Sequence, residues 1–376
     1  MSTEKRFEFR DLFNSKLIQQ IAQDIHLVYP DFDRTAFADH IHPQLAPLAL
    51  KERANCIAEA LHLFLPKDFN KAGHILLESL GAELEEIDFS GASAFMYMPH
   101  GIFVSRYGLN EQHFELSTTF LYEMTKRFSA EFAIRPFLDK HPDKMLQKLQ
   151  QWVVDDNQHV RRLVSEGTRP RLPWAARLTV FDDNYTVISH LLDQLKNDPE
   201  LYVRRSVANH LNDLTKDRKA LVIKKLTQWN KKATPAIQWI TKHALRSLIK
   251  AGDKAALGLL GFSDQPKVEV QNFKLQSNSI KIGEQLAFSF EILSLSKEKQ
   301  PLIIDYSVHF MKANGQQAPK VFKLKIADLA ANQRLKVKKK QRFQQLSTRT
   351  LYVGQHSIAL QINGQTFGKL DFDLLP

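Results

Sequence analysis

The chain of 376 residues is 43% hydrophobic and 25% charged, which excludes a wholly disordered protein and suits two globular domains. Its net charge of +11 is unevenly spread, with −6 over residues 1–130, +8 over residues 131–266 and +9 over residues 267–376. An acidic first third before two basic thirds predicts a surface that binds a polyanion, and nucleic acid is the commonest such partner. A basic protein without such a partner is the alternative.

The N-terminal sequence MSTEKRFEFRDLF is charged and lacks an apolar core, so we expect no secretory signal there. No apolar run reaches the roughly 18 residues that a membrane helix needs. The single cysteine, Cys56, can form neither an internal disulfide nor a thiolate metal cluster, which indicates a reducing compartment. We therefore expect a cytoplasmic protein.

Apolar residues recur at helical spacing up to about residue 260, and this part of the chain contains an internal repeat. The string VRR at residues 160–162 recurs 43 residues later, at 203–205. A period near 40 residues with two helices per unit is typical of HEAT-like α-solenoids, which present one helix of each pair on a concave surface. We expect clear units at residues 141–169, 185–217 and 218–252, and weaker helix pairs at residues 34–65 and 113–140.

Polar residues should cover the concave side of the second helix in each unit. A rotation of about 100° per residue puts Arg162 and Glu166 together on the outward face of a helix at residues 160–167. The equivalent outward residues of the next two units, on helices at 203–214 and 240–251, are Arg205, Asn209, Asn212, Asp213, Lys242, His243 and Arg246. We expect a basic surface with a few carboxylates embedded in it.

Carboxylates on such a surface repel phosphate, so Glu166 and Asp213 need either a cationic neighbour or a chemical role. One interpretation is a simple i,i+4 ion pair between Arg162 and Glu166. Trp174 follows a loop that two prolines keep from becoming helical. Its indole either stacks on a base or sugar, or fills the space between two repeats.

Apolar residues alternate after residue 265, as at 286–292 and 356–362, and Asn-Gly pairs signal hairpin turns at 314–315 and 363–364. The string GFSDQP at 261–266 marks a break, so we expect a helical domain at residues 1–262 and a β domain at residues 267–376. The β domain contains a basic run of Lys336, Lys338, Lys339, Lys340 and Arg342. These residues either protect a solvated edge strand from aggregation or grip DNA phosphates.

The stretch HVRRLVSEGTRPRLPW at residues 159–174 resembles the DNA alkylation repair glycosylases of the AlkC/AlkD HEAT-like family, and specifically the AlkC branch. The strings YVRRSVANHLND at 202–213 and HALR at 243–246 are similar to the same branch. Ile304-Asp305-Tyr306, Thr348-Arg349 and Gly354-Gln355-His356 resemble pieces of the immunoglobulin-like domain that some AlkC proteins append. The resemblance implies a multidomain α plus β fold, a HEAT-like α-solenoid followed by an immunoglobulin-like β-sandwich.

The resemblance also implies an activity, excision of cationic N-alkylated bases such as 3-methyladenine and 3-methylcytosine from double-stranded DNA in base excision repair. Carried over by matching motif, Glu166 and Asp213 would be active-site carboxylates, Glu131 a further acidic position and Trp174 the aromatic side chain beside the lesion. The DNA-binding residues would be Arg161, Arg162, Arg169, Arg171, Arg204, Arg205, Asn209, Lys242, His243 and Arg246, with Lys338, Lys339 and Lys340 in the β domain. We expect a monomer in the bacterial cytoplasm, associated with the nucleoid when it acts.

These residue types suit the chemistry. A base methylated at N3 is already cationic and leaves as a neutral molecule, so little general-acid help is needed. Nearby carboxylates stabilise the positive charge that develops at C1′, and one of them can orient or deprotonate the attacking water. A lysine nucleophile is unnecessary, so we expect a monofunctional glycosylase that does not nick the strand.

Other chemistries have no support in the sequence. The fourteen histidines form no HExxH motif, and GxGxxG, GxxxxGK[ST] and GxSxG are absent, so we expect neither a metal nor another cofactor. The alternative to an enzyme is a non-catalytic HEAT-repeat protein that binds nucleic acid or acts as a scaffold. A protein-binding adaptor would have an apolar concave stripe, and the arginines argue against one.

Overall fold

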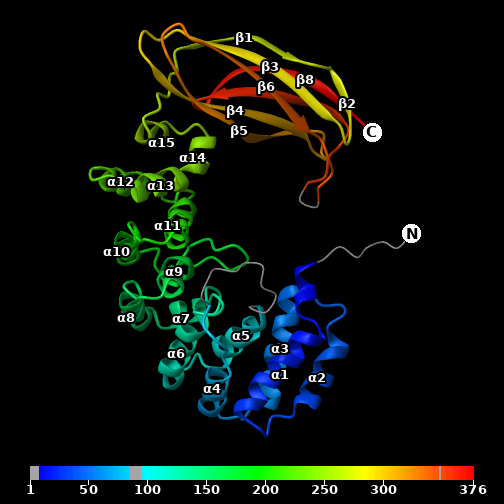
Figure 1. The fold of residues 1–376 in the computed structure, drawn as a ribbon, viewed down its shortest axis with the longest axis vertical. Coiled ribbons are helices and arrows are strands. Elements are labelled where there is room, and N and C mark those ends of the chain that lie inside the picture. Colours follow the sequence, from blue (N-terminus) through cyan, green and yellow to red (C-terminus); the bar gives the residue numbers. More distant parts are fainter. Residues whose placement is uncertain (1–7, 85–94, 347–348) are drawn as a thin grey trace. The chain divides into compact units, whose positions relative to one another are not determined.

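The computed structural model describes residues 8–84, 95–346 and 349–376, and these fall into two compact units. Unit 1 comprises Met1–Leu214 and Thr234–Ile240, and unit 2 comprises Thr215–Ala233 and Thr241–Pro376. Among the described residues the helices come first along the chain and the strands follow, which confirms the expected α plus β organisation (Figure 1). Because the last helices group with the strands, the expected boundary at residues 262–267 stays a prediction.

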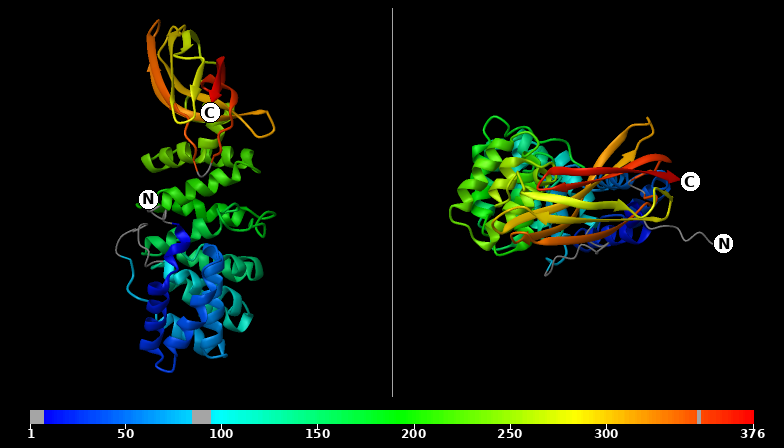
Figure 2. Two further views of the ribbon diagram at one scale, coloured as in Figure 1. Left: turned by 90° about the vertical axis from the view of Figure 1, so that its right-hand side faces the viewer. Right: turned by 90° about the horizontal axis from the view of Figure 1, so that it is seen from above.

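Unit 1 is built from helices that follow one another from blue through cyan to green in Figure 2. They are α1 (Ser15–Val28), α2 (Arg34–Ile41), α3 (Leu50–Phe64), α4 (Phe69–Glu78), α5 (Tyr97–Tyr107), α6 (Phe114–Thr125), α7 (Arg135–Lys140), α8 (Pro142–Trp152), α9 (Gln158–Gly167), α10 (Thr186–Leu195) and α11 (Leu201–Leu214), with short 3-10 turns at Phe9–Leu12, His42–Gln44 and Glu111–His113. None of the described helices has the length and apolarity needed to cross a membrane.

Local sequence explains where several of these helices begin. Asn14, Asp33, Asp68 and Asn157 are N-cap residues whose side chains accept a hydrogen bond from a backbone N–H of the first turn. Each cap satisfies a donor that has no partner inside the helix. The apolar stripe of each helix then packs inward, as Val160, Leu163 and Val164 of α9 do.

The helix pairs confirm most of the predicted repeats. α8 with α9 and α10 with α11 are the pairs expected at residues 141–169 and 185–217, and α2 with α3 and α6 with α7 are the weaker pairs. The expected helix over 240–251 is wrong, because α13 (Pro235–Ala244) ends one residue before Leu245 and α14 (Arg246–Lys250) begins after it. We predicted no pair for α4 and α5.

Unit 2 contains α12 (Lys219–Asn230), α14 and α15 (Lys254–Leu259), part of α13, and a two-layer β-sandwich. Its strands are β1 (Val268–Leu275), β2 (Ser279–Lys281), β3 (Gln285–Ser294), β4 (Gln300–Met311), β5 (Gln317–Leu329), β6 (Arg334–Arg342), β7 (Gly354–Ile362) and β8 (Gln365–Leu375). One sheet has the order β1-β3-β6 and the other the order β2-β8-β7-β4-β5 (Figure 1).

The alternating strands bury one face each, as the sequence predicted. Leu286, Phe288, Phe290 and Ile292 of β3 point into the sandwich core. The turn between β7 and β8 is formed by Asn363-Gly364, both with positive φ (44° and 82°), which explains the Asn-Gly pair there.

The pieces that resemble the immunoglobulin-like domain have structural roles in unit 2. Ile304, Tyr306 and His356 are buried, and the Arg349 guanidinium lies 4.4 Å from the centroid of the Phe310 ring. Thr348 lies outside the described residues.

Candidate active site

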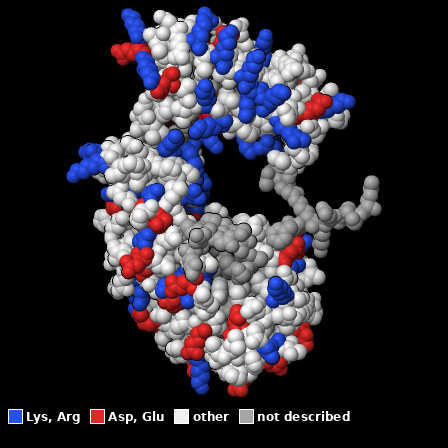
Figure 3. Space-filling model, viewed as in Figure 1, with Lys and Arg blue, Asp and Glu red and all other residues white. Residues whose placement is uncertain are grey.

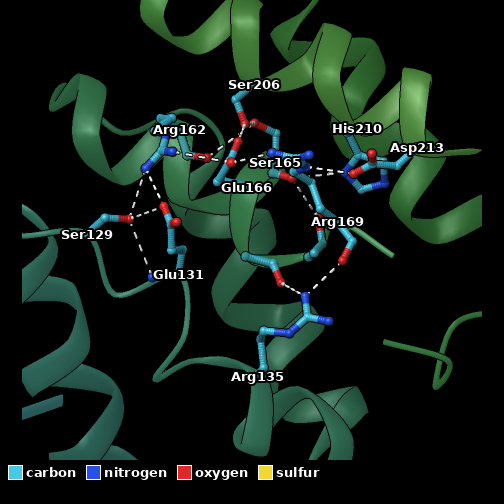
Figure 4. Close-up of polar contacts among 12 residues, drawn as sticks. Ser129, Glu131, Arg135, Arg162, Ser165, Glu166, Arg169, Ser206, His210 and Asp213 are labelled. Atoms are coloured by element: carbon cyan, nitrogen blue, oxygen red, sulfur yellow. Dashed lines mark hydrogen bonds and ion pairs between the residues drawn. The ribbon is translucent and has the colours of Figure 1, made fainter. Parts of the chain in front are cut away.

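Five charged side chains meet in unit 1 where α9 packs against α11 (Figure 4). We call this group the arginine–carboxylate cluster; its members are Glu131, Arg162, Glu166, Arg169 and Asp213. The three carboxylates expected at an active site are therefore brought together, with two of the arginines expected to bind DNA.

Glu166 is the most completely held carboxylate. Its Oε1 accepts from Arg169 Nη1 at 2.6 Å and lies 3.4 Å from Arg162 Nη2, and its Oε2 accepts from Ser206 Oγ at 2.6 Å. Burial alone would raise the pKa of Glu166, but the Arg162 and Arg169 charges and the Ser206 hydrogen bond outweigh it and hold the pKa below its usual value. Glu166 is therefore ionised at neutral pH, and the predicted i,i+4 pair with Arg162 is one part of a larger network.

Asp213 lies on the other side of the Arg169 guanidinium. Its Oδ2 accepts from Arg169 Nε at 2.8 Å, so one arginine bridges Asp213 and Glu166. The Oδ1 atom takes part in no hydrogen bond or ion pair among the residues that the structure describes. Asp213 thus offers a carboxylate oxygen that Arg169 does not already hold.

Glu131 joins the cluster from the segment before α7. Its Oε2 accepts from Arg162 Nη1 at 2.7 Å and from Ser129 Oγ at 2.8 Å. The Arg162 guanidinium also lies 4.9 Å from the centroid of the Tyr202 ring. The guanidinium of Arg162 is thus fixed between Glu131, Glu166 and an aromatic face.

The cluster carries a surplus of negative charge. Three carboxylates against two guanidinium groups give a net charge of −1 in a region where the side chains are mostly buried, with exposed fractions of 6% for Glu166, 9% for Asp213 and 16% for Glu131. Coulomb interactions are stronger in such a poorly hydrated site than in water. Because the two arginines neutralise only two of the three carboxylates, the remaining negative charge attracts a further cationic group.

The structure differs from the sequence expectation in how open this site is. Glu166, Asn212 and Asp213 were expected on an outward face, yet all three are buried, whereas Arg205 is exposed and Asn209 is half-buried. Helical periodicity identifies the polar face of a helix but not what covers it. Here Ser206 of α11 and Arg169 of the loop after α9 cover the carboxylates.

The loop after α9 is fixed by Arg135, a buried residue that the sequence analysis did not select. Its guanidinium donates to the backbone oxygens of Gly167 at 3.1 Å, Arg169 at 2.8 Å and Ala176 at 2.6 Å. Burial lowers the pKa of Arg135, and Asp139 is the charge that most opposes this effect. Arg135 therefore anchors the segment that carries Arg169 and Trp174.

Trp174 lies on this loop with its indole exposed. It is 65% exposed, so the alternative that it fills the space between repeats is wrong. Its φ of 66° is unusual for a bulky residue, and Lys51 Nζ donates to its backbone oxygen. Arg171, on the same loop, is half-buried.

A neutral histidine contacts the residue that precedes Glu166 on α9. His210 is fully buried; its Nδ1 donates to the Ser165 backbone oxygen at 2.9 Å and its Nε2 accepts from Tyr185 Oη at 2.6 Å. The adjacent Ser165 Oγ lies 2.6 Å from Ser206 Oγ, which donates to Glu166. Burial lowers the pKa of His210 to about 4.

This depressed pKa predicts acid sensitivity. A histidine that must stay neutral in the folded state contributes fully above its unfolded pKa of about 6.5, and its contribution is lost as the pH falls toward 4. We expect the free energy of unfolding to fall by roughly 1 kcal/mol per pH unit for this group below pH 6.5. Urea unfolding of the wild type and His210→Gln between pH 7.5 and 5 checks this, and an equally steep decline in both proteins would contradict it.

Two arginines of the repeated VRR strings have structural partners. Arg161 Nε donates to Asp198 at 2.6 Å and its Nη1 to the backbone oxygens of Asp155 and Asp156 at 2.8 Å. Arg204, its equivalent 43 residues later, donates in the same way to the backbone oxygens of Asp198 and Pro199 at 2.6 and 2.7 Å. These two guanidinium groups fix the loops between paired helices, which explains why this part of the string repeats.

The remaining expected DNA-binding residues lie in unit 2. Lys242 is exposed, His243 is half-buried, and Arg246 Nη1 donates to the His243 backbone oxygen at 2.6 Å. Lys and Arg side chains gather over the β-strands of this unit (Figure 3).

The lysines of β6 lie at the edge of the three-stranded sheet. Lys338 and Lys340 lie opposite Ser289 and Ala287 of β3, whereas Lys339 lies opposite the core residue Phe288. Directly paired residues point to the same side of a sheet, so Lys338 and Lys340 share the outer face and Lys339 does not. A basic depression of about 620 Å³ on this sheet is lined by all three lysines, with Lys274 on β1.

Comparison with known proteins reveals similarity along nearly the whole chain. Residues 269–376 match the family described as "Uncharacterised protein YhaZ, C-terminal Ig-like domain". The uncharacterized protein YhaZ of Bacillus subtilis (strain 168) is 36% identical over 368 residues, which cover 98% of this chain and 99% of that protein. The solved structure of Pseudomonas fluorescens alkylpurine DNA glycosylase AlkC, bound to DNA containing an abasic site analog, is 36% identical, has a TM-score of 0.91, and covers 98% of this chain and 100% of that chain.

Proposed function

We propose a function from the premise that the chain belongs to the AlkC family of DNA alkylation repair glycosylases, of which YhaZ and AlkC are relatives of similar length. The protein is a DNA glycosylase. We propose that it hydrolyses the N-glycosidic bond of cationic bases, 3-methyladenine and 3-methylcytosine among them, in double-stranded DNA. The observation that carries this proposal is the surplus carboxylate of the arginine–carboxylate cluster.

The surplus negative charge suits the transition state of this reaction. As the bond from C1′ to the base nitrogen breaks, the electron pair goes to the base, which becomes neutral, and positive charge moves to the sugar. Fixed carboxylates in a poorly hydrated site stabilise that charge without having to reorganise. A neutral base would leave as an anion, and the carboxylates would repel that anion while they stabilise the sugar, so the same charges favour cationic lesions over neutral bases.

We assign the water-activating role to Asp213. Both oxygens of Glu166 are already held by Arg169 and Ser206, whereas Asp213 Oδ1 takes part in no hydrogen bond or ion pair among the described residues. Asp213 can accept a proton from the water whose oxygen attacks C1′, and it then returns that proton to solvent. Glu166 and Glu131 hold the arginines and supply fixed negative charge.

We propose that Trp174 stacks on the DNA beside the lesion, because its indole is exposed on a loop that Arg135 and Lys51 fix. Arg205 and Lys242, which are exposed, and the half-buried Arg171 would contact phosphates. Arg162 and Arg169 hold the carboxylates, and Arg161 and Arg204 hold the inter-helix loops. We propose that the enzyme acts as a monomer. Because its substrate is chromosomal DNA, we also propose that it works in the cytoplasm.

The β domain is proposed to contribute to DNA binding through the outer face of β6. Replacing both Lys338 and Lys340 by Gln should reduce the slope of log K against log salt concentration by up to about 1.8, or about 0.9 per phosphate contact removed. The matched control replaces Lys323 and Lys325 by Gln, because these two exposed lysines lie on β5 in the other sheet. Filter-binding titrations at several salt concentrations measure the slopes, and an unchanged slope in the double variant eliminates a role for this face.

The substrate range can be tested on duplex DNA treated with a methylating agent. We expect the protein to release 3-methyladenine and 3-methylcytosine, identified as free bases by mass spectrometry, and to leave uracil in a uracil-containing duplex. Release of uracil at a comparable rate would contradict selection by charge. Tight binding of the DNA without release of any base would contradict the proposed hydrolysis and would favour the alternative, a non-catalytic protein that binds nucleic acid.

A further inference from the structure

A pocket of about 330 Å³ lies beside Trp174 in unit 1, outside the arginine–carboxylate cluster. Its lining comes from α3, α5, α7 with the segment before it, and the loop after α9, and it includes Lys51, Met98, Ile102, Phe132, Asp139 and Trp174. A volume at the lower end of the range for small-molecule sites suits a single planar ring system.

The backbone beside this pocket is strained. The φ of 66° at Trp174 is in the left-handed region, which bulky residues avoid because Cβ crowds the backbone. The surrounding structure holds this conformation, since Lys51 Nζ donates to the Trp174 backbone oxygen and Arg135 Nη2 donates to that of Ala176. Strain held in this way is typical of segments that bind a ligand.

The lining has the chemistry of a nucleotide site. The Lys51 ammonium lies 5.6 Å from the centroid of the Phe132 ring, so a cation and an aromatic face stand together. Met98 and Ile102 add half-buried apolar surface. A cation beside aromatic faces is the combination by which proteins hold unstacked nucleotides, the base on the ring and the phosphate on the cation.

Asp139 adds a hydrogen-bond acceptor to the lining. Its carboxylate can accept from an exocyclic amino group, which adenine, guanine and cytosine carry and thymine does not. The pocket therefore favours a base with an amino group on its edge.

We propose that this pocket receives one unstacked, amino-bearing nucleobase, held between Phe132 and Trp174 with Lys51 beside it. The inference rests on the proposed function, because excision of an alkylated base creates such bases in two ways. One is the guanine that loses its partner when 3-methylcytosine is excised, and the other is the excised base itself, since 3-methyladenine and 3-methylcytosine both carry an amino group.

The first arm of the test measures binding rather than excision. The probe is a duplex with an abasic-site analogue opposite guanine, and its dissociation constant is compared with that of an intact duplex. If the base in the opposite strand is the occupant, Ile102→Phe, which fills the pocket, should reduce the preference for the abasic duplex about tenfold, because the stacking of that base is lost. Ile102→Val, which leaves the pocket open, should keep the preference.

The second arm measures inhibition of excision by free 3-methyladenine. If the excised base is the occupant, Ile102→Phe should raise the inhibition constant about tenfold and leave the preference for the abasic duplex intact. Ala175→Met fills the pocket from the loop and should reproduce the result if Ile102→Phe fails to fold. The proposal is overturned if a filled, folded variant matches the wild type in both arms, whereas failure of the proposed function would appear as no base release by the wild type.

Discussion

Asp213→Asn should reduce the rate of 3-methyladenine excision by about 100- to 1000-fold while DNA affinity changes by less than about threefold. The amide keeps the shape of the side chain but carries no charge and cannot accept a proton from water. The surplus charge of the arginine–carboxylate cluster falls from −1 to zero, so the cationic sugar loses its stabilisation. Single-turnover excision from a duplex with one lesion measures the rate, and fluorescence anisotropy measures the affinity.

Asp198→Asn is the matched control for this substitution. Asp198 is equally buried and accepts from Arg161 Nε at 2.6 Å, but it lies outside the cluster. We expect the folded Asp198→Asn protein to excise at the wild-type rate. Equal losses in the two variants would show that the effect of Asp213→Asn comes from stability rather than from the site.

Arg169→Gln should have the largest effect on stability, a loss of about 3–5 kcal/mol in the free energy of unfolding. The substitution removes the guanidinium that bridges Glu166 at 2.6 Å and Asp213 at 2.8 Å. Glu166 keeps the Ser206 hydrogen bond but only the longer of its two ion pairs, to Arg162, and Asp213 loses its one ion pair among the described residues. Two nearly buried carboxylates are then left without sufficient positive charge.

The loss in Arg169→Gln should depend on pH. In the wild type the pKa of Glu166 is depressed, so its contribution is present above the unfolded pKa of about 4.3 and is lost only as the pH falls below that value. Without Arg169, burial raises that pKa, so the difference from the wild type should be larger at pH 7.5 than at pH 5. Adding Asp213→Asn should restore part of the stability; a purely additive double variant would contradict the bridge.

Much of the fold could be predicted from the sequence because it depends on local patterns. A repeat of 43 residues gives the spacing of α9 and α11, and alternating apolar residues give β3 and β7. The break between α13 and α14 at Leu245 was not predicted, because the apolar periodicity continues across it.

The identity of the site residues could be predicted from the sequence, but the contacts among their side chains could not. Motif and periodicity selected Glu166, Asp213 and Arg169, but not that Arg169 bridges the two carboxylates, because that contact joins segments 44 residues apart through a loop. Arg135 was missed, although one charged residue among Ala133, Ile134 and Phe137 is a signal of a buried guanidinium.

Product analysis after incubation with a duplex that carries a single 3-methyladenine gives the most direct test of carboxylate-assisted hydrolysis by this protein. We expect one equivalent of free 3-methyladenine and an unbroken strand with an abasic site, formed by the wild type and not detectably by a Glu166→Gln/Asp213→Asn double variant. Equal release by both proteins would show that these acids do no chemistry, and a strand cleaved by the wild type would show a mechanism other than simple hydrolysis.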